Sequence, residues 1–98
     1  MATEVHVQGR IESGKLPYFA TAVARYKQYA QSHGYAVPQV LLGLSGEMNT
    51  IRLVYRYDDP AEYRKHEVRT LRDSEYGRIA GEMSFVDGTV RYAIYEQL

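Results

Sequence analysis

The segment from Leu41 to Tyr76 constrains the fold most, because it predicts a hairpin, a strand and two capped helices without a break. A glycine and an asparagine in the polar gap 45–49 predict the hairpin loop. Residues 49–57 then alternate between an apolar or aromatic set and a mostly basic set, as in a strand with unlike faces. The first set is Ile51, Leu53, Tyr55 and Tyr57, and the second is Arg52, Val54 and Arg56.

Helix-start signals follow this strand twice. Asp59 is a good N-cap residue, and Pro60 suits the first helical position, so a helix is predicted to begin at Pro60. Glu62 completes the signal, because its side chain can reach back to a free backbone donor. The segment 73–75, Asp-Ser-Glu, resembles a second N-terminus, and Gly77 and Gly81 weaken a helix beyond it. We therefore expect one helix, a bend and a shorter helix before Met83.

The other elements are predicted from periodicity and from turn residues. Alternation predicts strands at 4–11 and 89–96, and a short apolar run predicts a strand at 37–44. Apolar residues at helical spacing predict a helix over 15–33, which Gly34 ends. Asp87 and Gly88 predict the turn before the last strand. The order β-α-β-β-α-β over residues 1–98 predicts one α+β domain of the ferredoxin-like type, with a four-stranded antiparallel sheet.

Both helices of such a motif lie on one side of the sheet, so the two sheet faces are expected to differ. The set expected to face the helices is apolar: Val5, Val7, Leu53, Tyr55, Val90 and Ile94. The set expected on the other face is mixed: His6, Gln8, Arg10, Arg52, Val54, Arg56, Arg91, Ala93 and Tyr95. The mixed face is expected to meet water or a partner.

Composition narrows the class of partner. Twelve basic residues balance twelve acidic ones, so nothing points to nucleic acid or to a membrane surface, and a small ligand or a protein partner is expected. The absence of cysteine excludes disulfides, thiolate nucleophiles and cysteine metal sites. No signal peptide or long apolar run is present, which favours a cytoplasmic protein. The ten tyrosines predict an interior with hydroxyls to satisfy, in a wet cavity or at an interface.

Histidines are the first candidates for acid–base chemistry. His6 lies within a strand, where the alternatives are proton transfer or an ordinary hydrogen bond at the sheet surface. His66 either faces a pocket, with Glu62 or Thr70 one turn away, or points into water beside its charged neighbours. His33 falls in the last turn of the predicted first helix, which suits a helix C-terminal residue.

Arginines and tyrosines form the second group of candidates. Arg52, Arg56 and Arg91 share a predicted face, where they can hold a carboxylate, a phosphate or an enolate, or pair with acidic residues across a dimer. The tyrosines of the strands can stack on an aromatic ligand or simply pack. This aromatic set is Tyr55, Tyr57, Tyr92 and Tyr95, with Tyr18 nearby in the predicted first helix. The sequence holds no phosphate-binding loop, dinucleotide fingerprint, nucleophile elbow or histidine pair at metal-ligand spacing.

Short motifs distributed over nearly the whole chain resemble those of the NIPSNAP family, within the dimeric α+β barrel superfamily. They are Gly14-Lys15-Leu16-x-x-Phe19, Leu42-Gly43, Gly46-x-x-Asn49, Tyr55-Arg56-Tyr57-Asp58, Arg64 and the run Leu71-Arg72-Asp73-Ser74-Glu75-Tyr76. Tyr76 stands where tryptophan is common in that family. The resemblance implies a homodimer in which two sheets pack face to face, and a pocket between each sheet and its helices.

Two functional hypotheses follow, since relatives in the superfamily include cofactor-independent monooxygenases, cyclases and dehydratases. In the first, the chain binds a small aromatic or polyketide-like molecule between sheet and helices and transforms it without a cofactor or metal. His6, Tyr55 and Arg52 are then the catalytic candidates, and the ligand-binding candidates are Arg56, Arg91, Tyr95, Tyr57 and His66. In the second, the chain is a non-catalytic dimeric interaction module whose interior is filled by its own side chains.

Overall fold

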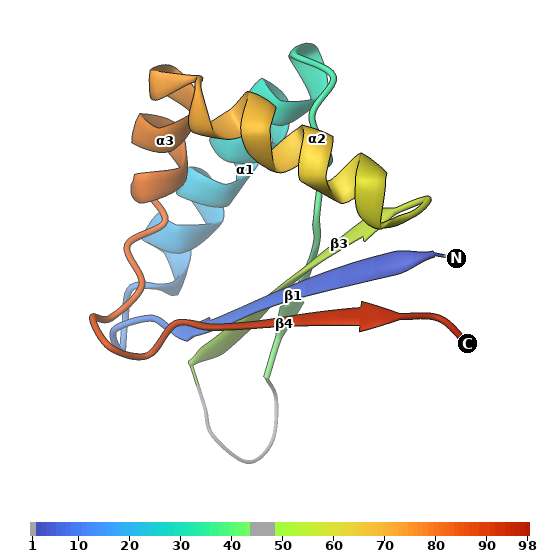
Figure 1. Ribbon diagram of the computed structural model, residues 1–98. Coiled ribbons are helices and arrows are strands. Elements are labelled where there is room, and N and C mark those ends of the chain that lie inside the picture. The colour runs from blue at the N-terminus through green and yellow to red at the C-terminus, as the bar shows by residue number, and fades with distance from the viewer. Residues whose placement is uncertain (1, 44–48) are drawn as a thin grey trace.

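The fold is a four-stranded antiparallel sheet with all three helices on one side (Figure 1). The computed structural model describes residues 2–43 and 49–98. The elements in chain order are β1 (Thr3–Arg10), α1 (Leu16–Ser32), β2 (Gln39–Leu42), β3 (Thr50–Tyr57), α2 (Pro60–Leu71), α3 (Ser74–Gly81) and β4 (Arg91–Glu96). The strand order β2-β3-β1-β4 is that of the ferredoxin-like split motif, so the predicted fold class is confirmed.

The helix boundaries follow from their capping residues. The Asp59 carboxylate accepts a 2.8 Å hydrogen bond from the Glu62 N–H, and α2 begins at Pro60 as predicted. The Asp73 carboxylate accepts a 3.1 Å bond from the Tyr76 N–H, so α3 is a separate helix, also as predicted. Gly34 has φ of +69°, in the left-handed region that lets the chain leave α1.

Two strands are shorter than the sequence pattern predicts. β4 begins at Arg91 rather than at residue 89, because the Arg10 N–H donates to the Thr89 hydroxyl oxygen (3.1 Å) instead of to a strand carbonyl. β2 begins at Gln39 rather than at residue 37, directly after Pro38, which has no N–H to donate. The predicted hairpin loop lies largely at 44–48, outside the described residues. Asn49, at its end, has φ of +66°.

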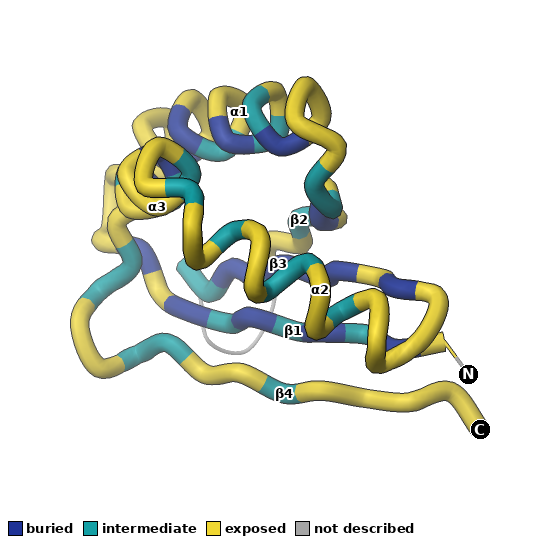
Figure 2. The backbone as a smooth tube through the Cα atoms, turned by 45° about the horizontal axis from the view of Figure 1, so that its top comes forward, coloured by how far each residue is buried: buried dark blue, intermediate teal, exposed yellow. Residues whose placement is uncertain are grey.

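Strand register decides which side chains meet the helices. Val5 pairs with Tyr55 and Val7 with Leu53, so these side chains share one face. The helices pack on that face, and its buried residues line the interior in Figure 2. The largest fully buried apolar side chains are Tyr26, Ile51 and Leu53. The predicted assignment of faces is confirmed, and no helix covers the mixed face among the described residues.

Candidate functional site

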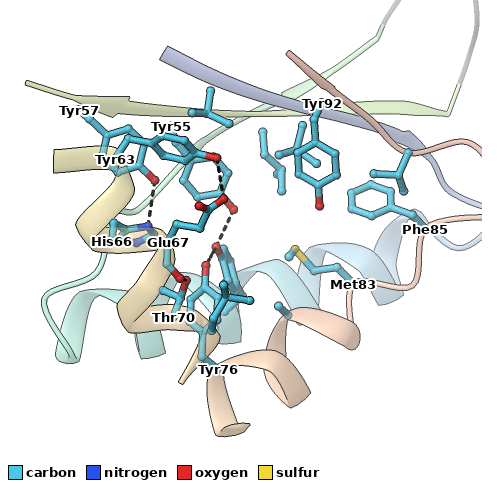
Figure 3. A pocket seen from close by; sticks show the side chains of 17 residues that line it. Tyr55, Tyr57, Tyr63, His66, Glu67, Thr70, Tyr76, Met83, Phe85 and Tyr92 are labelled. Carbon is cyan, nitrogen blue, oxygen red and sulfur yellow. Dashed lines mark hydrogen bonds between the residues drawn. The ribbon is translucent and has the colours of Figure 1, made fainter. Parts of the chain in front are cut away.

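A cavity of about 350 Å³ lies between the sheet and the helices (Figure 3). Its walls are mainly apolar and aromatic, and its polar groups come from strands and helices alike. The residues used below are Tyr55 and Tyr57 from β3, Tyr63, His66 and Glu67 from α2, Tyr76 from α3, and Tyr26 from α1. A cavity of this size and character is typical of small-molecule sites.

Three tyrosine hydroxyls form a chain on the wall of this cavity. Tyr26 Oη lies 2.6 Å from Tyr55 Oη and 2.6 Å from Tyr76 Oη. Burial raises the pKa of Tyr26 and of Tyr55 above the usual value, since a phenolate here would lose its hydration. The chain therefore consists of neutral hydroxyls, which donate and accept hydrogen bonds but do not act as phenolate bases at neutral pH.

His66 is held at one end of the cavity by two partners from distant parts of the chain. Its Nδ1 lies 3.1 Å from Tyr57 Oη, and its Nε2 accepts a 3.1 Å hydrogen bond from the Ala36 N–H. Burial, and secondarily the positive charge of Arg69, lowers the pKa of His66 below its usual value. The alternative that its charged neighbours leave His66 in water is wrong, and its partners are not Glu62 or Thr70.

Glu67 is the carboxylate of the cavity wall, and its two oxygens already have partners. The Tyr63 hydroxyl donates to Oε2 at 3.1 Å, and Arg64 donates to Oε1 at 2.9 Å. This pairing keeps a charge-compensated carboxylate beside an otherwise uncharged cavity.

His6 lies on the opposite face of the sheet, where both ring nitrogens are engaged. Its Nε2 lies 2.7 Å from Glu4 Oε1, and its Nδ1 lies 3.2 Å from an Arg52 nitrogen. Arg52 can only donate, so Nδ1 accepts and the neutral ring donates through Nε2–H to Glu4. The hydrogen bond from His6, followed by the charge of Arg56, lowers the pKa of Glu4. Sequence reasoning missed this pair, although alternation along the strand puts Glu4 on the same face as His6.

The three arginines of this face do not converge on one point. Arg52 donates to Gln8 as well as to His6, whereas Arg56 donates to Glu4 (3.2 Å) and to Gln39 (3.2 Å). Arg91, on the other side of β1, donates to the Gly88 and Val90 carbonyls at 3.1 and 3.3 Å. They are therefore spread along the mixed face rather than gathered into an anion clamp.

The sequence-derived candidates thus separate into two groups. Tyr55, Tyr57 and His66 line the cavity. His6, Arg52, Arg56, Arg91 and Tyr95 lie on the other face, where the Tyr95 ring meets the His6 ring edge-on with centroids 4.8 Å apart. The structure does not bring Tyr55 together with His6 and Arg52, because the side chains of neighbouring strand positions point to opposite faces.

Sequence reasoning missed Tyr26 and Tyr76 as cavity residues. Tyr26 falls on the apolar face of α1, and Tyr76 follows the predicted N-cap of α3 by three positions. Their hydroxyls meet across a sequence separation of 50 residues, which no local pattern encodes.

Searches for two other kinds of site give negative results for residues 2–43 and 49–98. No group of three or more histidine, aspartate or glutamate side chains lies close enough to share a metal ion. None of the helices described is long and apolar enough to cross a membrane.

Solved structures share this fold over the whole chain. A NIPSNAP family protein from Agrobacterium tumefaciens str. C58 superposes with a TM-score of 0.78 at 12% identity, covering 100% of this chain and 94% of that one. An uncharacterized NIPSNAP domain protein from Burkholderia xenovorans gives 0.77 at 18% identity, covering 100% and 95%. A proposed antibiotic biosynthesis monooxygenase from Nitrosomonas europaea gives 0.70 at 12% identity, covering 99% and 90%.

No protein-family model matches the sequence, and no curated protein matches it. The chain therefore has the fold of NIPSNAP proteins and of dimeric α+β barrels, as its motifs predicted. Sequence identities of 12–18% establish a shared fold but not a shared function.

Proposed function

We propose that this protein binds a small aromatic or polyketide-like molecule in the cavity between sheet and helices, and acts on it without a cofactor. The observation that carries the proposal is the cavity of about 350 Å³ with tyrosine hydroxyls on its wall. Small-molecule sites are typically apolar, with a few placed polar groups and volumes of roughly 300–1,000 Å³. Tyr55, Tyr57 and His66 are the proposed ligand contacts.

The proposal includes a homodimer formed through the mixed face of the sheet. Leu41 and Tyr95 are exposed there (44% and 52%), although both are large apolar or aromatic side chains. Arg52 and Arg56 already have acceptors within the protomer, which lowers the cost of covering them. His6, Arg52, Arg56, Arg91 and Tyr95 would then lie at the interface rather than in the ligand cavity.

The chemistry supported at the cavity is binding and polarisation of a neutral ligand. Neutral tyrosine hydroxyls can donate hydrogen bonds to oxygen atoms that gain negative charge during a reaction. His66 is poorly suited as a general base, because the Ala36 N–H occupies its Nε2. His6 and Arg52, the other catalytic candidates, lie on the opposite face of the sheet from this cavity, so in the proposed dimer they would contribute to the interface.

The interaction-module hypothesis requires an interior filled by tyrosine side chains. The described interior instead keeps a cavity beside those tyrosines. This difference favours the ligand-binding hypothesis over the non-catalytic one.

The test is a binding experiment with a cavity-filling variant. Ala80 lines the cavity, whereas Ala24 is an exposed alanine on α1, so Ala80→Phe and Ala24→Phe are a matched pair. The probe is 1-tetralone, a small bicyclic aromatic ketone, titrated into labelled protein and followed by NMR. We expect the wild type and Ala24→Phe to bind it and Ala80→Phe to lose binding. Equal binding by all three folded proteins, or none by the wild type at millimolar probe, would overturn the proposal.

A further inference from the structure

The Ala36 N–H determines where the proton of His66 sits. This backbone group can only donate, and its nitrogen lies 3.1 Å from His66 Nε2, so Nε2 must carry a lone pair. A neutral imidazole has one N–H, which is then on Nδ1. The half-buried position of the ring disfavours the imidazolium, which would also turn an N–H toward the Ala36 N–H.

The tautomer of His66 in turn decides whether the Tyr57 hydroxyl donates or accepts in the contact between them. Because Nδ1 carries the hydrogen, the 3.1 Å contact runs from Nδ1–H to Tyr57 Oη, and the tyrosine oxygen accepts. Its own hydroxyl hydrogen has no acceptor among residues 2–43 and 49–98. Tyr57 is 9% exposed and lines the cavity, as Figure 3 shows at the His66 end. A buried hydroxyl hydrogen without an acceptor costs free energy until a ligand or water accepts it.

The hydroxyls of Tyr26, Tyr55 and Tyr76 do not add a second free donor to the cavity. Tyr26 bonds to both of the others, and Tyr55 and Tyr76 also interact with each other. Three hydroxyls that face one another in this way can use all three of their hydrogens among themselves. The donor left for a ligand is therefore the Tyr57 hydroxyl.

We propose that His66 is a positioning residue that holds the Tyr57 hydroxyl as a hydrogen-bond donor, so that the cavity selects uncharged aromatic ligands carrying an acceptor oxygen, such as a ketone or quinone. The inference rests on the proposed function, because it names the class of molecule for the same cavity. It assigns His66 a role in ligand selection rather than in proton abstraction.

The first test needs no ligand. Long-range ¹H–¹⁵N correlation spectra of ¹⁵N-labelled protein at pH 8 report the protonation state of each ring nitrogen. We expect His66 to show a protonated Nδ1 and an unprotonated Nε2, with the assignment made from a His66→Gln sample. A proton on Nε2, or exchange between both tautomers, would overturn the inference.

The second test compares three probes of similar size. 1-Tetralone offers only an acceptor, indole offers only an N–H donor, and tetralin offers neither. In the wild type we expect 1-tetralone to bind roughly tenfold more tightly than tetralin, the equivalent of one net hydrogen bond of about 1.4 kcal/mol. We expect indole to gain no such advantage.

Substitutions then separate positioning from packing. Tyr57→Phe should abolish the preference for 1-tetralone while keeping the affinity for tetralin. His66→Gln should keep the preference, because a glutamine oxygen can accept from Ala36 while its NH₂ donates to Tyr57, whereas His66→Leu should lose it. If His66→Leu does not fold, Tyr57→Phe and His66→Gln still decide the question.

The two proposals fail in different ways. If the wild type binds none of the probes, the proposed ligand cavity is wrong, and the inference fails with it. If the probes bind but 1-tetralone has no advantage, or Tyr57→Phe preserves that advantage, the inference alone is wrong.

Discussion

The carboxylate of Asp73 accepts a 2.8 Å hydrogen bond from the hydroxyl of Tyr35, which joins the start of α3 to the connection between α1 and β2. The same carboxylate accepts from the Tyr29 hydroxyl (2.9 Å) and caps α3 through the Tyr76 N–H. These hydrogen bonds lower the pKa of Asp73, and the one from Tyr35 has the largest effect. One side chain therefore explains both the break between α2 and α3 and the placement of Tyr76 at the cavity.

Replacing Asp73 should cost more stability than replacing the other N-cap aspartate. Asp59→Ala removes a single capping bond and should lower the free energy of unfolding by about 1 kcal/mol. Asp73→Ala removes a capping bond together with the acceptor for two tyrosines, so its loss should be clearly larger. Urea unfolding followed by circular dichroism measures both. Equal losses for the two variants would show that the tyrosine bonds contribute nothing.

Removing the hydroxyl of Tyr26, the middle member of the cavity chain, should destabilise the protein more than removing an exposed tyrosine hydroxyl. Tyr26 is 1% exposed, and Tyr26→Phe removes both hydrogen bonds of the chain. We expect a loss of about 1–3 kcal/mol, because the buried Tyr55 hydroxyl is left without this partner. Tyr18→Phe, at an exposed position on α1, should change stability by less than about 0.5 kcal/mol. Chemical denaturation of the two variants compares them, and equal stabilities would contradict the role of the chain.

Local signals were sufficient to predict the fold. Asp59 and Pro60 mark the start of α2 because capping depends on neighbouring residues, and alternation assigns the sheet faces for the same reason. Strand ends were less predictable, because β4 loses two residues to a bond between Arg10 and the Thr89 side chain, 79 positions apart. Such a bond depends on the tertiary arrangement, which a local pattern does not contain.

The candidate site was predictable only in part. Tyr55 and Tyr57 were placed correctly on the helix side, since arginines at 52 and 56 mark the other face of their strand, although Val54 on that face is apolar and buried. His66 was ambiguous, because charged neighbours on α2 indicate a solvated face while its decisive partner, the Ala36 N–H, lies 30 residues earlier. The spacing of Tyr63, His66 and Thr70, three and four residues apart, was the available signal for one helix face toward the cavity.

The protein should become less stable as the pH is lowered below neutrality, and His66 should cause part of this loss. Its folded-state pKa lies below the usual value near 6.5, so the unfolded chain binds more protons below neutrality, and the free energy of unfolding decreases as the pH falls from about 7.5 to 5. The groups facing the ring are Tyr57 from β3, Tyr35 from the loop before β2, and Arg69 from α2, none of which is a carboxylate.

The matched variant for this pH dependence is His66→Gln, which cannot take up the proton. Its unfolding free energy should depend less on pH than that of the wild type over the same interval. Urea titrations at half-unit pH steps give the two slopes. The lowered pKa values of Glu4, Asp73 and Glu75 also favour the folded state, but that contribution is lost only in more acidic solution. Parallel curves for the two proteins would contradict the assignment.

Gly9 should tolerate no side chain, because β1 passes directly beneath the ring of Phe85. A Cβ atom at Gly9 would lie 2.6 Å from Phe85 Cδ1, so Gly9→Ala must displace the ring and should cost about 1–3 kcal/mol. Gly77, inside α3, has no atom within 4 Å of such a Cβ, and Gly77→Ala should stabilise the protein by about 0.5–1 kcal/mol. Thermal unfolding distinguishes the two, and a stabilising Gly9→Ala would show that Phe85 is free to move.

Two adjacent residues of β2 provide a sharp test of the proposed dimer. Leu41 pairs with Arg52 and Leu42 with Ile51, so the first side chain lies on the mixed face and the second on the helix side. Both are partly exposed, at 44% and 39%. If the mixed faces of two copies pack together, Leu41→Glu replaces an apolar contact by a carboxylate that must lose its hydration in the interface even beside Arg52, whereas Leu42→Glu does not.

We therefore expect wild type and Leu42→Glu to sediment as dimers at micromolar concentration, and Leu41→Glu to shift toward the monomer by at least tenfold in dissociation constant. Sedimentation velocity over a concentration series measures the shift. A monomeric wild type would overturn the dimer itself. Dissociation by Leu42→Glu but not by Leu41→Glu would place the interface on the helix side, and would require Arg52 and Arg56 to be solvent-facing residues instead.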